Sequence, residues 1–165
     1  MISKLFNIRN LILLVAALAI FACISCVNNR SDLFVDCIYK QLNDFGAVSG
    51  NVSIDVPEGV KGYLVISAPY AINNSKEISL LKIGKRVKQK MIEKIQGDSA
   101  FHVFILNESK IAHHEKLTSF PAVFNTYFSV PLEQNCSVVF SLENKVLTGI
   151  SMFKLNRGQG YMFER

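Results

Sequence analysis

Residues 48–56, with the sequence VSGNVSIDV, set the fold class of this chain. Apolar or small residues alternate there with Ser, Asn and Asp, and this period of two predicts a half-buried β-strand. A Pro-Glu-Gly turn follows at residues 57–59, and the more apolar stretch 62–70 predicts a second strand. The chain is therefore expected to build a sheet with one face in a core.

The same bias toward β-branched and aromatic residues returns in the second half of the chain. Further strands are predicted at residues 101–106, 123–132, 136–142 and 146–155. Residues 32–45 differ, because their apolar side chains recur every three or four positions and Gly46 follows as a stop signal, which predicts a helix. The expected fold is mainly β with one or two helices: a two-layer antiparallel β-sandwich after an N-terminal helix.

Residues 75–96 fit two patterns. Their apolar positions match an amphipathic helix capped by Ser75, and they also match two strands broken at residues 84–85; we favour the helix. This stretch holds a run of basic side chains: Lys82, Lys85, Arg86, Lys88, Lys90 and Lys94. Such a run predicts contact with an anionic membrane surface or an acidic partner. A solvated face balanced by acids elsewhere is the plainer alternative.

The first 26 residues have the layout of an export signal. Lys4 and Arg9 precede a long uncharged apolar run that ends at Cys26. Residues 27–30 then form a short polar tether, and residues 31–165 are expected to form a single β-rich domain. The apolar run lies at the lower edge of the length that spans a bilayer, so a retained signal anchor is the alternative.

The end of that run carries two cysteine motifs. Ile20-Phe-Ala-Cys23, and next to it Cys23-Ile-Ser-Cys26, resemble the lipobox of bacterial lipoproteins. The resemblance implies acylation of Cys23 or Cys26 and attachment to the membrane through the acyl chains. Because neither cysteine is followed by aspartate, it further implies the outer membrane, with the domain facing the periplasm.

Four segments of the predicted sheet carry a second resemblance. Residues 48–54, 62–66, 128–132 and 136–140 look like transthyretin-like sandwich modules. Such modules occur in lipoproteins of bacterial secretion machines, including the type VI outer-membrane lipoprotein and pilotin-type lipoproteins. The resemblance implies a binding or assembly role next to another envelope protein.

Two further features concern the cysteines of the domain and its C-terminal tail. Cys37 and Cys136 form an even pair in an oxidising compartment, which predicts a disulfide, with two unrelated buried thiols as the alternative. The tail residues Tyr161, Met162 and Phe163 leave apolar side chains to bury, either in a last edge strand or against a partner.

No motif names a reaction. His102 is expected to point outward from a strand, and His113 and His114 to lie in a polar surface loop without metal-ligand spacing, so no catalytic residue, metal or cofactor is predicted. A net charge of +5 and the absence of Trp do not indicate nucleic-acid binding. The leading hypothesis is a non-catalytic, lipid-anchored envelope protein.

Two other classes stay open. One is a secreted hydrolase or small-molecule binder with the histidines near a pocket. The other is a glycosylated eukaryotic secretory protein, because the chain has five Asn-X-Ser sequons, which begin at Asn29, Asn51, Asn73, Asn107 and Asn135.

Overall fold

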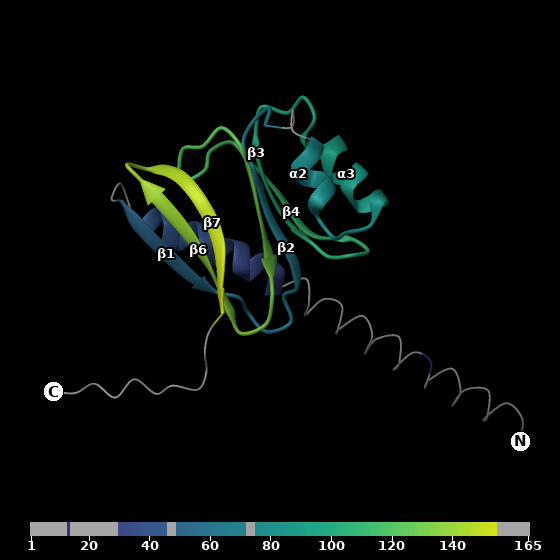
Figure 1. Ribbon diagram of the computed structural model, residues 1–165, viewed down its shortest axis with the longest axis horizontal. Helices are drawn as coiled ribbons and strands as arrows, with labels where there is room; N and C mark the ends of the chain where they lie inside the picture. The colour runs from purple at the N-terminus through teal and green to yellow at the C-terminus, as the bar shows by residue number, and fades with distance from the viewer. Residues whose placement is uncertain (1–12, 14–29, 46–48, 72–74, 155–165) are drawn as a thin grey trace, which may run out of the picture.

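The computed structural model describes residues 13, 30–45, 49–71 and 75–154 (Figure 1). A helix covers residues 30–45. The elements that follow it are β1 (Gly50–Asp55), β2 (Gly62–Ser67), α2 (Ser75–Leu80), α3 (Lys85–Ile95), β3 (Phe101–Leu106), β4 (Ile111–Leu117), β5 (Tyr127–Leu132), β6 (Cys136–Glu143) and β7 (Val146–Lys154).

The strands form two antiparallel sheets. The smaller has the order β1-β6-β7 and the larger the order β4-β3-β2-β5. Figure 1 shows the two sheets side by side, with α2 and α3 on the outer side of the larger sheet. The prediction of a mainly β fold with two antiparallel sheets is confirmed, and the two short helices add a layer outside it.

The main core lies between the sheets and the helix at residues 30–45. The helix buries Phe34, Ile38 and Leu42 in it, at the three- and four-residue spacing of one helix face. Ile54 of β1 and Phe140 of β6 enter the same core from the smaller sheet. The alternation within residues 50–56 thus directs Val52, Ile54 and Val56 inward, as predicted.

A second core lies between the larger sheet and the two short helices. Val87, Met91 and Ile95 of α3, four residues apart, pack with Phe104 of β3 and Val65 of β2. Helix is therefore the structure adopted within residues 75–96, and residues 81–84 between α2 and α3 are non-helical. The larger sheet is buried on both faces, which explains why β2 and β3 are almost continuously apolar.

At the start of β2, the backbone lies very close to the backbone of β3. Gly62 has φ +115°, and a Cβ atom there would lie 1.9 Å from the backbone oxygen of Leu106 on β3. Only glycine fits this position, because it lacks Cβ and accepts a positive φ.

The structure contradicts the predicted disulfide and the predicted surface loop at His113 and His114. Cys37 and Cys136 carry free thiols and form no disulfide: Cys37 lies in the helix at residues 30–45, whereas Cys136 is fully buried at the start of β6. An even number of cysteines does not ensure that two of them lie within the short Cα separation that a disulfide requires. His113 and His114 lie within strand β4 and not in a surface loop. Arg30, predicted to end the tether, is already helical.

No helix in the described ranges is long and apolar enough to cross a membrane. The predicted lipidation residues Cys23 and Cys26, and the predicted docking residues Tyr161, Met162 and Phe163, lie outside the described residues.

Candidate functional site: a basic groove beside an edge strand

The start of α3 is held against the turn between β3 and β4. The backbone N–H of Gly84 donates to the backbone oxygen of Glu108 at 2.9 Å. A Cβ atom on Gly84 would lie 2.9 Å from that oxygen, so the contact depends on the absence of a side chain. The first turn of α3 therefore has a fixed position relative to the β3–β4 turn.

The turn itself is built by one side chain. Asn107 Oδ1 accepts hydrogen bonds from the backbone N–H of Ser109 at 3.2 Å and of Lys110 at 2.9 Å. The backbone N–H of Asn107 in turn donates to the oxygen of Lys110 at 3.0 Å. Asn and Asp favour such turns because their side chains can replace a backbone acceptor. These bonds fix the backbone of Lys110 next to α3.

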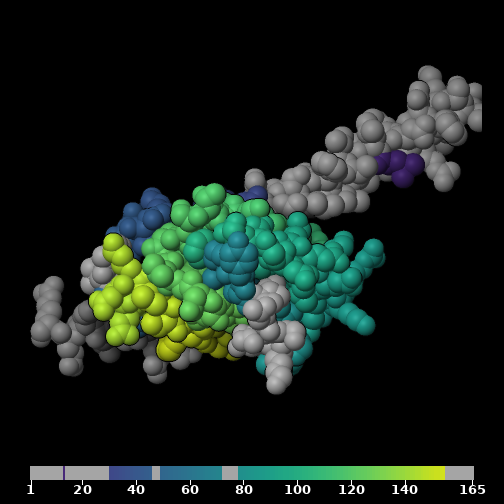
Figure 2. Space-filling view, turned by 90° about the horizontal axis from the view of Figure 1, so that it is seen from above, coloured from purple at the N-terminus to yellow at the C-terminus, as the bar shows by residue number. Residues whose placement is uncertain are grey.

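One side of α3 faces this turn with its basic residues. Arg86, Lys90 and Lys94 are spaced four residues apart, so they form one row along the helix. Each directly precedes one of the buried residues Val87, Met91 and Ile95, which places the row at the border of the helix–sheet interface. Figure 2 shows the segment around α3, in teal, at one end of the body with long side chains projecting from it.

Between this row and the turn lies a cavity of about 460 Å³. Its lining consists of Arg86, Val87, Lys90, Lys94, Ser109, Lys110 and Ile111. We call this cavity and the row along it the basic groove. The lining contains four cationic side chains and no acidic one, and none of the four forms an ion pair with a side chain of the described ranges. Four cations concentrated without counter-charges create a strong local preference for anions.

The basic run predicted from the sequence divides in two. Arg86, Lys90 and Lys94 line the groove, whereas Lys82, Lys85 and Lys88 do not. Lys88 has a structural role, since its Nζ donates to the backbone oxygen of Ser79 at 2.7 Å and ties α3 to α2. Lys110 was missed by sequence reasoning because it stands in a four-residue turn outside the run, and no local pattern marks it.

Strand β4 borders the groove and is an edge of the larger sheet. It pairs antiparallel with β3 on one side. On its other side no strand of the described ranges is paired with it. An edge strand leaves alternate N–H and C=O groups open to another chain.

A polar network lies at the far end of the groove, between α3 and β4. His102 is 1% exposed, and its Nδ1 lies 3.0 Å from Nε2 of His114 on β4. Its Nε2 lies 3.3 Å from Oδ2 of Asp98, and this carboxylate is bound at 2.7 Å by Nζ of Lys116. The phenyl ring of Phe104 stacks on the His114 ring with centroids 4.4 Å apart. The expectation that His102 points outward is therefore wrong: its partners allow it to be buried.

The network favours neutral imidazoles. Burial lowers the pKa of His102. Burial, followed by the nearby charge of Lys94, lowers the pKa of His114 to about 4. The hydrogen bond from Lys116 holds the pKa of Asp98 below its usual range. The histidine pair at the far end of the groove is thus uncharged at neutral pH, and the positive charge of the groove comes from its Lys and Arg side chains.

His113 faces the opposite side of β4. Its Nδ1 lies 2.5 Å from Oδ1 of Asp32, which connects β4 to the helix at residues 30–45. The three histidines therefore do not converge on one point. Within the described ranges no group of three or more His, Cys, Asp or Glu side chains is placed to hold a metal ion.

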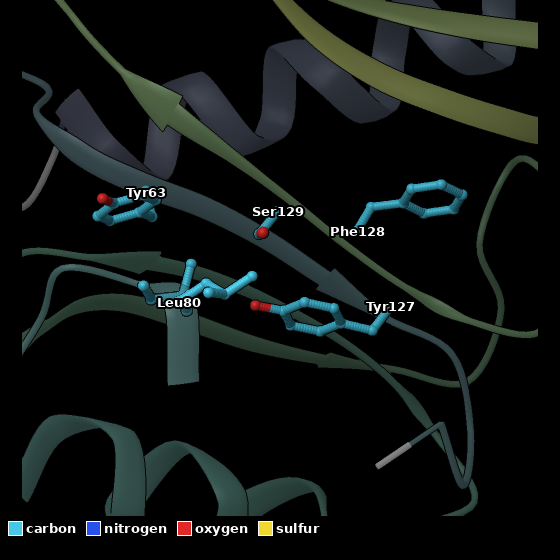
Figure 3. A pocket seen from close by; sticks show the side chains of 6 residues that line it. Tyr63, Leu80, Tyr127, Phe128 and Ser129 are labelled. Carbon is cyan, nitrogen blue, oxygen red and sulfur yellow. The ribbon is translucent and has the colours of Figure 1, made fainter. Parts of the chain in front are cut away.

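A second cavity, of about 410 Å³, lies between α2 and strands β2 and β5 (Figure 3). Its lining is Tyr63, Leu80, Leu81, Tyr127, Phe128 and Ser129. Figure 3 shows Tyr63 and Tyr127 on either side of Leu80, with Phe128 directed away from them. The lining carries no charged group and no histidine.

Comparisons of this chain with protein-family models, curated proteins and solved structures gave no match.

Proposed function

We propose that this protein is a lipid-anchored protein of the bacterial envelope, held at the outer membrane and facing the periplasm, with a non-catalytic role in binding and assembly. In this proposal the basic groove captures an acidic region of another envelope protein. An accessory lipoprotein of a secretion system is the role that this combination fits best. The proposal rests above all on one observation, the four cations of the groove without an acidic partner.

The groove lies near Arg30, where the chain enters the described domain, and this position supports an anchored mode of action. Arg30 donates from Nη1 to the backbone oxygen of Glu58 at 2.7 Å, which fixes the chain entry beside the β1–β2 turn. That turn leads into β2 at Gly62, next to the end of β3 and the turn that carries Lys110. The chain entry and one end of the groove therefore share one end of the larger sheet.

The length of the tether limits how far the domain reaches. Cys26 precedes Arg30 by four residues and Cys23 by seven. Even fully extended, these segments span only about 14 Å and about 25 Å respectively. An acyl anchor on either cysteine would hold the groove close to the leaflet, where the membrane-proximal part of a larger assembly is available to it.

The second class, a hydrolase with histidines at a pocket, receives less support. His102 is 1% exposed and His113 is bound to Asp32. Neither of the two cavities described above has a histidine in its lining. A general base must reach its substrate within hydrogen-bond distance, and the imidazoles here are instead used to join strands and helices.

The test uses the full chain expressed in a bacterial host. Intact mass and membrane partitioning are measured for the wild type and for Cys23→Ala and Cys26→Ala. We expect an acyl-sized mass increase that one of the two variants abolishes, together with loss of membrane attachment. Clean cleavage without an acyl group would refute the anchored part of the proposal.

The binding part is tested in intact cells with a photo-crosslinking amino acid at position 109, in the lining of the groove. We expect discrete protein adducts that disappear when Lys90→Glu and Lys94→Glu are combined. The matched control combines Lys82→Glu and Lys85→Glu, which make the same change of charge outside the groove. Adducts that are equally reduced by both pairs, or absent from the wild type, would contradict capture by the groove.

A further inference from the structure

We propose that the partner enters the groove as an extended acidic segment that adds to strand β4, with carboxylates at every second position facing Arg86, Lys90 and Lys94. The inference rests on the proposed function and specifies the chemistry and the conformation of the partner. It follows from the direction of α3, the spacing of its cations and the open edge beside them.

Helix α3 runs alongside β4 in the same direction. At one end, the N–H of Gly84 donates to the oxygen of Glu108 in the turn that leads into β4. At the other end, Asp98, three residues after α3, binds Nζ of Lys116 near the end of β4. The two elements are therefore joined at both ends, and the row of cations follows the strand over its length.

The spacing of the cations matches that of a β-strand. Residues four apart on a helix are separated by about 6 Å along the axis. Residues two apart on a strand lie about 6.6 Å apart and point to the same face. Three alternate side chains of an added strand would thus stand opposite Arg86, Lys90 and Lys94 with an offset of only about 1 Å by the third pair.

The backbone of β4 supplies the second component of recognition. Its free edge can form a ladder of main-chain hydrogen bonds with an incoming strand, as in β-augmentation. Main-chain bonds alone carry no sequence preference, whereas the cations of α3 select acidic side chains at alternate positions. The two components together specify a strand with alternating carboxylates and not merely an acidic region.

The acidic side chains described near the groove do not occupy the place proposed for the partner's carboxylates. Glu93 accepts a hydrogen bond from Gln89 at 3.1 Å, and Asp98 is bound to Lys116. Glu115 lies on the other face of β4, 3.7 Å from Nε2 of His113. Glu108 is in the turn but not in the lining of the cavity.

The shape of the groove favours a peptide over a lipid headgroup. The row from Arg86 to Lys94 is about 12 Å long, and the cavity is recessed between a helix and a hairpin. One phosphate would satisfy one or two of these cations, whereas an extended chain contacts all three. Anionic membrane binding is therefore the competing outcome of the test.

The experiment uses the purified full chain in neutral detergent and two synthetic peptides of about nine residues, slightly longer than β4. One peptide alternates Thr and Glu. The other has the same five Thr and four Glu residues with all Glu residues in one block, so its charge is identical but only two of its carboxylates lie on any one face of a strand. Binding is measured by fluorescence anisotropy, and amide hydrogen exchange of β4 is measured with and without peptide.

We expect the alternating peptide to bind at least about tenfold more tightly than the block peptide. The combination Lys90→Glu and Lys94→Glu should remove this preference, whereas Lys82→Glu with Lys85→Glu should preserve it, at unchanged melting temperature for both. Amide exchange in β4 should slow when the alternating peptide is bound, because the open edge becomes hydrogen-bonded.

Three results would overturn the inference. Equal affinity for both peptides would indicate charge attraction without strand addition. Unchanged exchange in β4 would exclude the edge as the docking site. Binding to phosphatidylglycerol vesicles but to neither peptide would assign the groove to the membrane surface. If crosslinks at position 109 persist while the peptides fail, the proposed function stands and only the strand addition is lost.

Discussion

The neutral pair His102 and His114 should make the fold sensitive to mild acid. His114 has a folded-state pKa of about 4, lowered by burial, Lys94, His102 and His113 and raised only by Asp98. In the unfolded chain the imidazole has the ordinary value of 6.5. Between these values the unfolded state binds more protons than the folded state, so the free energy of unfolding must fall as the pH falls.

The size of the effect follows from the two pKa values. For a fully buried group, the difference between 6.5 and about 4 corresponds to roughly 3 kcal/mol. His114 is partly exposed, and screening by solvent reduces the contribution to about 1–2 kcal/mol. The loss should begin below pH 6.5 and be complete near pH 4. His102, whose pKa is also lowered by burial, adds a loss of the same sign.

The measurement is urea unfolding of the full chain, followed by far-UV circular dichroism across this pH range. His114→Gln keeps a hydrogen-bonding group next to His102 but cannot take up a proton, so the variant should lose about 1–2 kcal/mol less than the wild type on acidification. Lys94→Gln removes the second-largest cause of the lowered pKa and should reduce the pH dependence in part. Lys40→Gln, on the helix at residues 30–45, is the matched control and should not change it. A His114 ring that titrates near 6.5 by NMR would refute the reasoning.

Two further predictions concern the fold. Gly62→Ala should destabilise the protein by about 3 kcal/mol or more, because its Cβ would meet the oxygen of Leu106 at 1.9 Å. Gly97→Ala, which also has a positive φ but nothing within 4 Å, should cost only about 1 kcal/mol, and similar losses in the two variants by urea unfolding would contradict the steric argument. Because Cys37 and Cys136 are free thiols, dithiothreitol should leave the melting temperature unchanged; a fall of roughly 10 °C would instead reveal a stabilising disulfide.

Local sequence patterns determined the main elements of this fold. The period of two at residues 48–56 and the three- and four-residue spacing at residues 32–45 predict β1 and the first helix within a few residues of their observed bounds. These patterns are reliable because each segment has one buried and one exposed face. The spacing of its apolar residues then equals the side-chain repeat of a helix or of a strand. The mainly β class follows from the same signal.

Strand β4 is an element that local sequence periodicity does not predict. Its sequence, IAHHEKL, has no alternation of apolar and polar residues. Half-buried residues occur on both faces of the strand, at five of its first six positions. As an edge strand it tolerates charged side chains, and one face contacts the first helix while the other lies beside α3. Its conformation depends on pairing with β3, which no local pattern records.

The sequence by itself thus determined the fold class, the first helix and the concentration of positive charge at residues 82–94. Only the tertiary structure decided that Arg86, Lys90 and Lys94 join Lys110 in one groove, that His102 is buried against His114, and that the two cysteines stay apart. The physical reason is the same in each case. Periodicity reports which face of a segment is buried, whereas a site or a bond depends on distances between segments far apart in the chain, and these are set only when the sheets and helices pack together.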